Sequence, residues 1–161
     1  MIEMYHKLHF SINIKDTCVL NLMNNELIFL NKSHLNLLTK LAINSLPNES
    51  CALLLGKRAY TKSIVKSILP MNNSLHSSVA FNINPDDLYN AYNKARVLEL
   101  DVISIFHSHP TNPLPSETDQ IFMLLNPIIW IIYSTSLNSF KAFIFDNLDH
   151  LKEIRIRFIK D

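Results

Sequence analysis

Apolar and polar positions alternate near the start of the chain. The period is two over residues 8–14, where the apolar positions are Leu8, Phe10, Ile12 and Ile14. This alternation is typical of a β-strand, because successive side chains of a strand point to opposite faces. A second short strand is expected from Cys18 to Leu22. The two segments together predict a β-hairpin within residues 1–25.

The segments that follow predict one more strand and then a helix. Glu26 to Leu30 has the pattern of a strand. From Lys32 the spacing becomes helical, and one apolar face is formed by Leu35, Leu38, Leu41, Ala42 and Leu46. Either Asn31 or Ser33 can cap the start of this helix, and Pro47 ends it.

Asn84-Pro85-Asp86-Asp87 predicts the start of a second helix. An asparagine cap, a proline at the first helical position and acidic residues in the first turn all favour a helix start. Its inward face is expected to carry Leu88, Ala91, Tyr92, Ala95 and Leu98. A polar loop is expected at Asn72–Ser78, and a short third helix at Asp119–Leu125.

Short apolar runs make up the remaining segments and predict strands. They lie at Cys51–Leu55, which ends in a turn at Gly56, and at Tyr60–Leu69, Val102–Phe106, Ile128–Tyr133, Phe140–Phe145 and Glu153–Ile159. The whole pattern predicts one mixed α/β (α+β) domain that is rich in sheet, with two main helices and one short helix.

The composition is that of an ordinary globular protein. Of the 161 residues, 48% are apolar and 18% are charged, which excludes a disordered chain. The net charge of +1 offers no electrostatic reason to expect a nucleic-acid or membrane partner. No apolar run is long enough to span a bilayer, and the N-terminus lacks the apolar stretch of a signal peptide. A cytoplasmic protein is therefore expected.

Cys18 and Cys51 are the only cysteines. Cys51 lies within an apolar run, so a buried thiol is expected there rather than a disulfide or a nucleophile. Trp130 is expected in the core for the same reason. Histidines that have no partner at ligand spacing are expected at the surface, namely His6, His9, His34, His76 and His150.

His107 and His109 lie two residues apart at the end of a predicted strand. Side chains at this spacing point to the same face, so both imidazoles can reach one metal ion. Asp119 can supply a third ligand, because the proline-rich loop at residues 110–115 turns the chain back on itself. Two histidines and one carboxylate suit a single Zn²⁺ and leave one coordination position open for water.

Two motifs resemble the signature of the JAMM (MPN+) metalloprotease family, in its small prokaryotic type. One is His107-Ser108-His109-Pro110 followed by Ser116-Glu117-Thr118-Asp119. The other is Pro47-Asn48-Glu49 directly before an apolar strand. The resemblance spans residue 26 to the C-terminus. It implies a catalytic domain at residues 26–161 with the cytidine-deaminase-like MPN fold, preceded by an N-terminal extension at residues 1–25.

The resemblance also implies a role for each site residue. His107, His109 and Asp119 match the zinc ligands of the family, Glu49 matches its acid/base, and Ser116 matches the serine that stabilises the oxyanion. The chain departs from the family pattern at two points. Six residues separate His109 from Ser116 where the family usually has seven, and Ala52 replaces a frequent glycine.

Some of these residues also have purely structural interpretations. Glu49 can be interpreted as a solvated loop residue, because glutamate side chains are mostly exposed. Ser116 and Asp119 have the spacing of a helix capping box, and an Asp119 that binds metal is expected to forfeit the reciprocal cap. Ser116 can hold both roles, because a capping serine lies beside free N–H groups.

The resemblance implies a zinc-dependent isopeptidase or peptidase. Its substrate would be a ubiquitin-like or sulfur-carrier protein, cleaved after the C-terminal diglycine, with the tail held as an added strand. One alternative is a catalytically inactive MPN-type scaffold. Another is a DNA-repair-associated relative of the RadC type, which Ser108 and the lack of a basic helical segment disfavour. For residues 1–25 three roles stay open: extending the sheet, covering its edge, or forming a homodimer.

Overall fold

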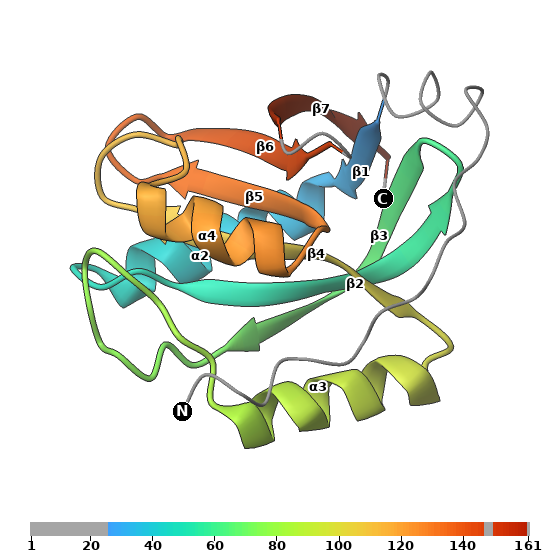
Figure 1. Cartoon of the computed structure of the whole chain (residues 1–161), viewed down its shortest axis with the longest axis horizontal. Coiled ribbons are helices and arrows are strands. Elements are labelled where there is room, and N and C mark those ends of the chain that lie inside the picture. The colour runs from blue at the N-terminus through green and yellow to red at the C-terminus, as the bar shows by residue number, and fades with distance from the viewer. Residues whose placement is uncertain (1–25, 147–149, 161) are drawn as a thin grey trace.

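The computed structural model describes residues 26–146 and 150–160 (Figure 1). The hairpin predicted within residues 1–25, together with His6, His9 and Cys18, lies outside the described residues. The strands are β1 (Leu27–Asn31), β2 (Cys51–Ala59), β3 (Lys62–Met71), β4 (Asp101–His109), β5 (Ile129–Ser134), β6 (Ser139–Phe145) and β7 (Leu151–Ile159). The helices are α2 (Lys32–Ser45), α3 (Pro85–Val97) and α4 (Glu117–Leu125). The predicted mixed α/β class is confirmed.

The seven described strands close into a barrel in the order β1-β3-β2-β4-β5-β6-β7. Closure comes from β1, which pairs in parallel with β7 on one edge and with β3 on the other. β4 and β5 are also parallel, and α4 lies in the connection between them. The remaining neighbours are antiparallel. The sheet is therefore mixed, as expected, but its closure was not predicted.

Asparagine caps begin the two longer helices, as the sequence indicates. The side chain of Asn31 accepts a hydrogen bond from the His34 amide at 2.8 Å, and the Asn31 amide donates to Nδ1 of His34 at 3.4 Å. His34 was expected only at the surface, but it completes this capping box. Asn84 accepts from the Asp86 amide at 2.9 Å, with Pro85 at the start of α3.

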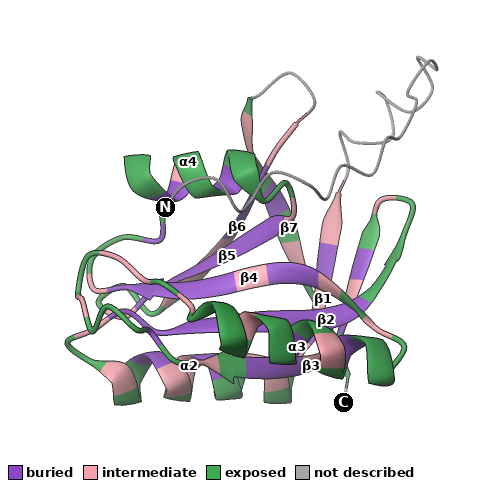
Figure 2. Cartoon of the chain, turned by 60° about the horizontal axis from the view of Figure 1, so that its bottom comes forward, coloured by how far each residue is buried: buried purple, intermediate pink, exposed green. Residues whose placement is uncertain are grey.

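The core has one inner and two outer parts. The inner cluster takes apolar side chains from all seven strands and from Leu38 and Ala42 of α2. On the outer face, Ala91 and Ala95 of α3 pack against β2, and Met123 of α4 packs against Trp130. Figure 2 shows the buried strands in the centre and the exposed outer faces of the helices. Burial of Trp130 and Cys51 is confirmed.

Three residues predicted to face inward do not. Tyr92 and Leu98 are 51% and 46% exposed, because α3 contacts the sheet through its alanines and Leu98 lies at the end of the helix. Leu46 is 49% exposed, since the helix ends before it.

Gly56 does not form the turn that ends β2, so that prediction was wrong. The strand continues to Ala59, and the turn contains Tyr60, whose φ is 53°. The β2–β3 register shifts between Leu55 and Gly56. A Cβ at position 56 would lie 2.0 Å from the carbonyl oxygen of Ile64. Glycine is needed here because the β3 backbone approaches closely.

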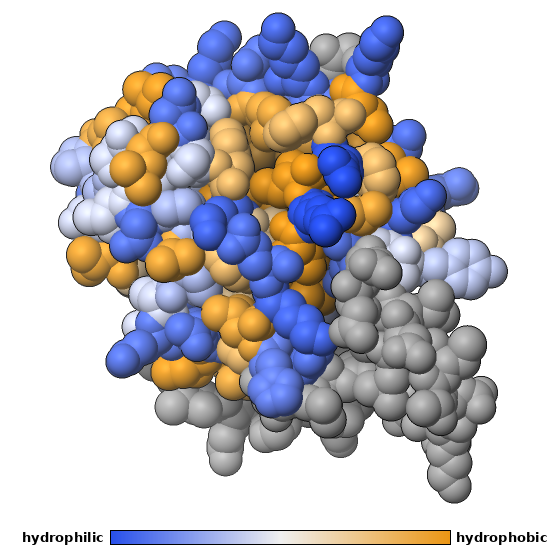
Figure 3. Space-filling model, turned by 90° about the horizontal axis from the view of Figure 1, so that it is seen from above, coloured by the Kyte–Doolittle hydropathy of each residue, from blue (hydrophilic) through white to orange (hydrophobic). Residues whose placement is uncertain are grey.

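β6 and β7 pair only over Ala142–Phe145 and Leu151–Ile154. Beyond these residues the two strands diverge around a hollow lined by residues 140–142 and 153–158. Figure 3 shows this side of the molecule from above, where apolar surface appears between charged side chains. Within the described chain, no helix combines the length and the apolar character needed to cross a membrane.

Candidate metal centre

His107 is the third residue from the end of β4, and His109 is the last. The strand is longer than the predicted Val102–Phe106, and both histidines belong to it. Alternate positions place them on the outer face of the barrel together with Ile105, which packs under α3 and α4. Their Nε2 atoms lie 2.9 Å apart.

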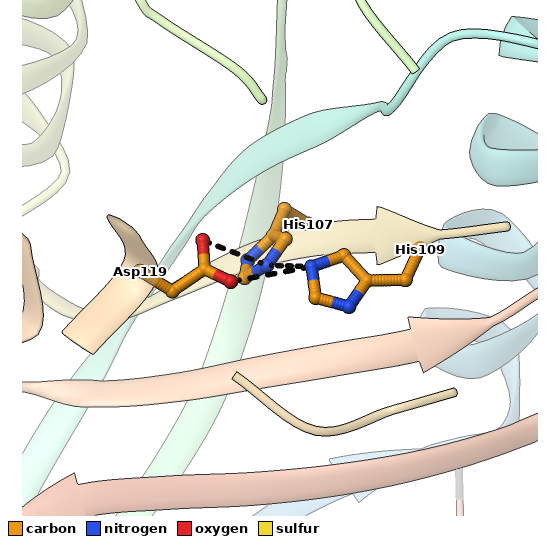
Figure 4. Close-up of side chains that lie close together, drawn as sticks. All are labelled: His107, His109 and Asp119. Carbon is orange, nitrogen blue, oxygen red and sulfur yellow. Dashed lines mark hydrogen bonds and ion pairs between the residues drawn. The ribbon is translucent and has the colours of Figure 1, made fainter. Parts of the chain in front are cut away.

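Asp119 reaches the same point from the first turn of α4. Its Oδ1 lies 3.3 Å from Nε2 of His107, and its Oδ2 lies 3.3 Å from Nε2 of His109 (Figure 4). All three residues are buried. Among the described residues they are the only cluster of histidine, cysteine and acidic side chains with the geometry to hold a metal ion. The structure thus brings together the three side chains that the sequence singled out.

The separations between these atoms fit a zinc ion. Ligands at about 2.0–2.1 Å from a tetrahedral zinc lie about 3.3 Å from one another. The two Nε2 atoms lie 2.9 Å apart, and each lies 3.3 Å from a different oxygen of the Asp119 carboxylate, so all three distances are close to that value. Two imidazole nitrogens and a carboxylate oxygen are also donors that zinc accepts. The residues present therefore fit this metal.

Local contacts set the orientation of each ring. Nδ1 of His109 donates a hydrogen bond to the Asn112 carbonyl at 3.1 Å, which orients the ring with Nε2 facing the centre. Phe81 stacks on His107 with ring centroids 4.9 Å apart, and Trp130 meets that ring edge-on at 5.8 Å. Nδ1 of His107 is buried and has no hydrogen-bond partner within residues 26–146 and 150–160.

Burial and charge act differently on the three groups. Burial lowers the pKa of His107, which favours the neutral imidazole that a metal requires. Burial also acts to lower the pKa of His109, but the hydrogen bond to Asp119 and the nearby carboxylates outweigh it and raise the pKa. Burial acts to raise the pKa of Asp119, but hydrogen bonds from both histidines hold it well below its usual range.

Glu49 lies in the short segment between α2 and β2 and is 3% exposed. Its Oε1 is 3.6 Å from Nε2 of His109. Burial raises the pKa of Glu49 to about 7, against the lowering effect of His109 and with a further increase from the Asp119 charge. The interpretation of Glu49 as a solvated loop residue is therefore wrong. A carboxyl group with this pKa can take up and release a proton near neutral pH.

Ser116 caps α4 and is tied to Asp119 by three hydrogen bonds. The amide and the hydroxyl of Ser116 each donate to Oδ2 of Asp119 at 2.7 Å. The Asp119 amide donates to Oγ of Ser116 at 3.1 Å. In this structure Oδ2 completes the cap while Oδ1 faces His107. The expectation that a metal-bound Asp119 forfeits the cap stays a prediction.

Cys51 is close to the site but is not a nucleophile. Burial raises the pKa of its thiol to about 12, and the Glu49 charge adds to the effect. The thiolate is the reactive form of cysteine, so this thiol is inert. Within the described residues Cys51 is a free cysteine, as expected.

Sequence reasoning missed Ser108, which lies between the two histidines and faces the other way. Its Oγ accepts hydrogen bonds from the amide and the hydroxyl of Ser50, both at 2.9 Å. The Ser108 amide donates to the Ser50 carbonyl at 3.0 Å. These bonds join the histidine strand to the residue after Glu49. The two-residue period of the strand could have indicated that Ser108 faces the side opposite to the two histidines.

The loop after His109 is held by β5 and the turn that follows it. The Thr111 carbonyl accepts hydrogen bonds from the hydroxyls of Ser134 and Ser136. The His109 carbonyl accepts one from the Thr135 amide at 3.0 Å. These hydrogen bonds fix the path of the shortened loop, which leads from His109 to Ser116 and Asp119.

The closed mixed barrel carries a buried His–His–carboxylate cluster with the geometry to hold a metal ion, and a further carboxyl group lies beside it. Residues 31–144 match the model of the prokaryotic homologs of the JAB domain. The chain belongs to this family, the prokaryotic branch of the JAMM (MPN+) proteins. The resemblance seen in the sequence is thereby confirmed.

Two individual relatives support the assignment. The chain is 31% identical over 115 residues to the desampylase of Pyrococcus furiosus, which covers 71% of this chain and 79% of that protein. It is also similar to the solution structure of protein DSY2949 from Desulfitobacterium hafniense. That match has a TM-score of 0.75 and 28% identity, and it covers 83% of this chain and 94% of the other.

Proposed function

We propose that this protein is a zinc-dependent isopeptidase or peptidase. Its substrate is a ubiquitin-like or sulfur-carrier protein, which it cleaves at the amide bond after the C-terminal diglycine. The convergence of His107, His109 and Asp119, with Glu49 beside them, carries the proposal. Similarity to a desampylase supports a ubiquitin-like modifier as the class of substrate.

In this proposal His107, His109 and Asp119 would hold the metal, and their donor atoms support it. A zinc ion bound there supplies Lewis-acid chemistry, which polarises the scissile carbonyl and acidifies a water molecule. The protein fixes its own ligands in advance through the Asn112 carbonyl, the Phe81 ring and the cap of α4. Such supporting contacts orient ligands and strengthen metal binding.

Glu49 acts as the acid/base in this proposal. Its carboxylate takes the proton of the attacking water and then delivers it to the leaving amine. Burial supports this role, because a pKa of about 7 makes both proton transfers favourable near neutral pH. The 3.6 Å separation from His109 keeps Glu49 beside the metal position.

Ser116 supplies a hydroxyl at the N-terminus of α4. There it can donate to the oxygen that becomes negative during amide hydrolysis, close to the free N–H groups of the first turn. In this structure the hydroxyl donates to Asp119 at 2.7 Å. A substrate oxygen would compete for that hydrogen bond.

Ser116→Ala is expected to slow hydrolysis by ~10²–10³-fold, because one donor to the oxyanion is lost. The measurement is kcat with a ubiquitin-like fusion substrate. Asn84→Ala is the control, since the Asn84 side chain also caps a helix but bonds to the Asp86 amide and not to a residue of the metal centre. The control should lose about 1 kcal/mol of stability and keep its activity. A loss of activity below threefold for Ser116→Ala would leave Ser116 with the capping role alone.

Metal removal tests the proposed function. The protein is incubated with ubiquitin-like proteins joined through their diglycine to a reporter, with and without a chelator. The protein is expected to contain about one zinc per chain and to cleave after the diglycine. Cleavage should stop when the chelator is added and return when zinc is restored. The His109→Ala variant should not regain activity when zinc is added. The control variant His76→Ala changes an exposed histidine and should behave like the wild type.

The outcomes separate the hypotheses. A zinc-loaded protein that leaves every substrate intact would contradict the peptidase proposal and favour the scaffold. Cleavage that survives complete zinc removal would contradict the assignment of the metal centre.

A further inference from the structure

Glu49 belongs to no helix or strand, so regular secondary structure does not fix its position. It lies in the segment 46–50 between α2 and β2. The loop at residues 72–84, which joins β3 to α3, holds both polar groups of its backbone. The Glu49 amide donates to the Ser77 carbonyl at 2.8 Å. The Glu49 carbonyl accepts from Nδ2 of Asn73 at 3.0 Å.

Asn73 uses its full hydrogen-bonding capacity, and it is 8% exposed. Nδ2 donates to the carbonyls of Glu49 and Ala80, at 3.0 and 3.1 Å. Oδ1 accepts from the amides of Leu75 and Asn82, at 3.1 and 3.2 Å. The two carbonyls on one side and the two amides on the other fix the orientation of the side-chain amide.

These contacts join two parts of the site. Ala80 and Asn82 flank Phe81, the ring that stacks on His107. The same side chain of Asn73 therefore holds the backbone of Glu49 and the segment that carries Phe81. On the other side, Ser50 is bound to Ser108 on the histidine strand.

We propose that Asn73 is a positioning residue that holds Glu49 beside the metal centre. The inference rests on the proposed function for the role of Glu49. Asn73 touches neither the metal ligands nor the substrate position, and it acts through the backbone of Glu49. Buried polar networks of this kind are rigid when every member is satisfied. Small displacements of a catalytic group are costly, since a shift of about 1 Å can reduce a rate by about 10²-fold.

The test compares Asn73→Ala and Asn73→Asp with Ser74→Ala. Asn73→Asp keeps the acceptors for Leu75 and Asn82 but removes the donor to Glu49. Ser74 is the matched control: it is exposed in the same loop, and among the described residues its hydroxyl bonds to Asn82 and not to Glu49. Both Asn73 variants should lower kcat by ~10–100-fold, with KM changed less than about twofold and zinc content unchanged. The Ser74 variant should match the wild type.

Two further measurements do not depend on activity. Trp130 is the only tryptophan, and its ring lies 6.0 Å from Phe81. Its fluorescence should change in both Asn73 variants and stay unchanged in Ser74→Ala. The Glu49 amide should lose protection from hydrogen exchange in the Asn73 variants, because its bond to Ser77 depends on the same loop.

Three results would overturn the proposal. They are an unchanged kcat, a loss that appears mainly in KM or zinc content, and Asn73 variants that do not fold. The last result would show that Asn73 serves the fold as a whole. If the wild-type protein cleaved no substrate, the proposed function would fail, but fluorescence and exchange would still decide whether Asn73 holds Glu49.

Discussion

Glu49→Gln is expected to lower kcat by ~10²–10⁴-fold while the zinc content stays at about one ion per chain. Glutamine has nearly the same size as glutamate, so the buried position stays filled. It cannot take up a proton near neutral pH, so the attacking water would lose its acceptor. The measurement is steady-state kinetics together with metal analysis of the purified variant.

Glu117→Gln is the matched control for this experiment. Glu117 is an exposed residue of α4, two positions from Asp119, and has no place in the proposed chemistry. It should keep the activity of the wild type within about twofold. Full activity in Glu49→Gln would remove Glu49 as the acid/base, and loss of zinc in that variant would show that Glu49 is itself a ligand.

Gly56→Ala is expected to destabilise the protein by about 3 kcal/mol, the upper part of the usual range for overpacking. The added Cβ would lie 2.0 Å from the Ile64 carbonyl oxygen and 2.6 Å from Cδ1 of Ile103. The Ile103 side chain can move away, but the β3 backbone can move only by disturbing its pairing with β2. The free energy of unfolding, measured with a chemical denaturant, tests this.

Lys57→Ala gives the comparison on the same strand. Lys57 is exposed and follows Gly56 directly, so its substitution should change stability by less than about 0.5 kcal/mol. Equal effects of the two substitutions would show that β2 and β3 do not approach as closely at Gly56 as described.

Local patterns predicted the elements well, because caps and periodicity act over a few residues. Asn31 and Asn84 begin helices where the sequence indicates them. Closure of the barrel was not predictable, since β1 and β7 pair residues that lie more than a hundred positions apart, such as Leu27 and Arg155. The error at Gly56 has a similar cause. A glycine required by the approach of another strand looks the same in sequence as one required by a turn.

The same distinction between local patterns and distant contacts applies to the residues of the site. His107, His109 and Asp119 could be found, because their spacing and the motif around them carry the signal. Asn112 could not, since it supports His109 through its backbone carbonyl, which every residue possesses. Asn73 appeared only as part of a polar loop. Its hydrogen bonds to backbone groups leave no pattern that a single sequence displays.

The capping box at the start of α4 has a consequence for the proposed metal site. Hydrogen bonds from Ser116 hold the Asp119 carboxylate in place through Oδ2. The conformational entropy of ordering this ligand is therefore lost when the chain folds, and not when metal arrives. If zinc binds as proposed, a ligand preorganised in this way would let the folded apoprotein bind the ion with little further ordering of the chain.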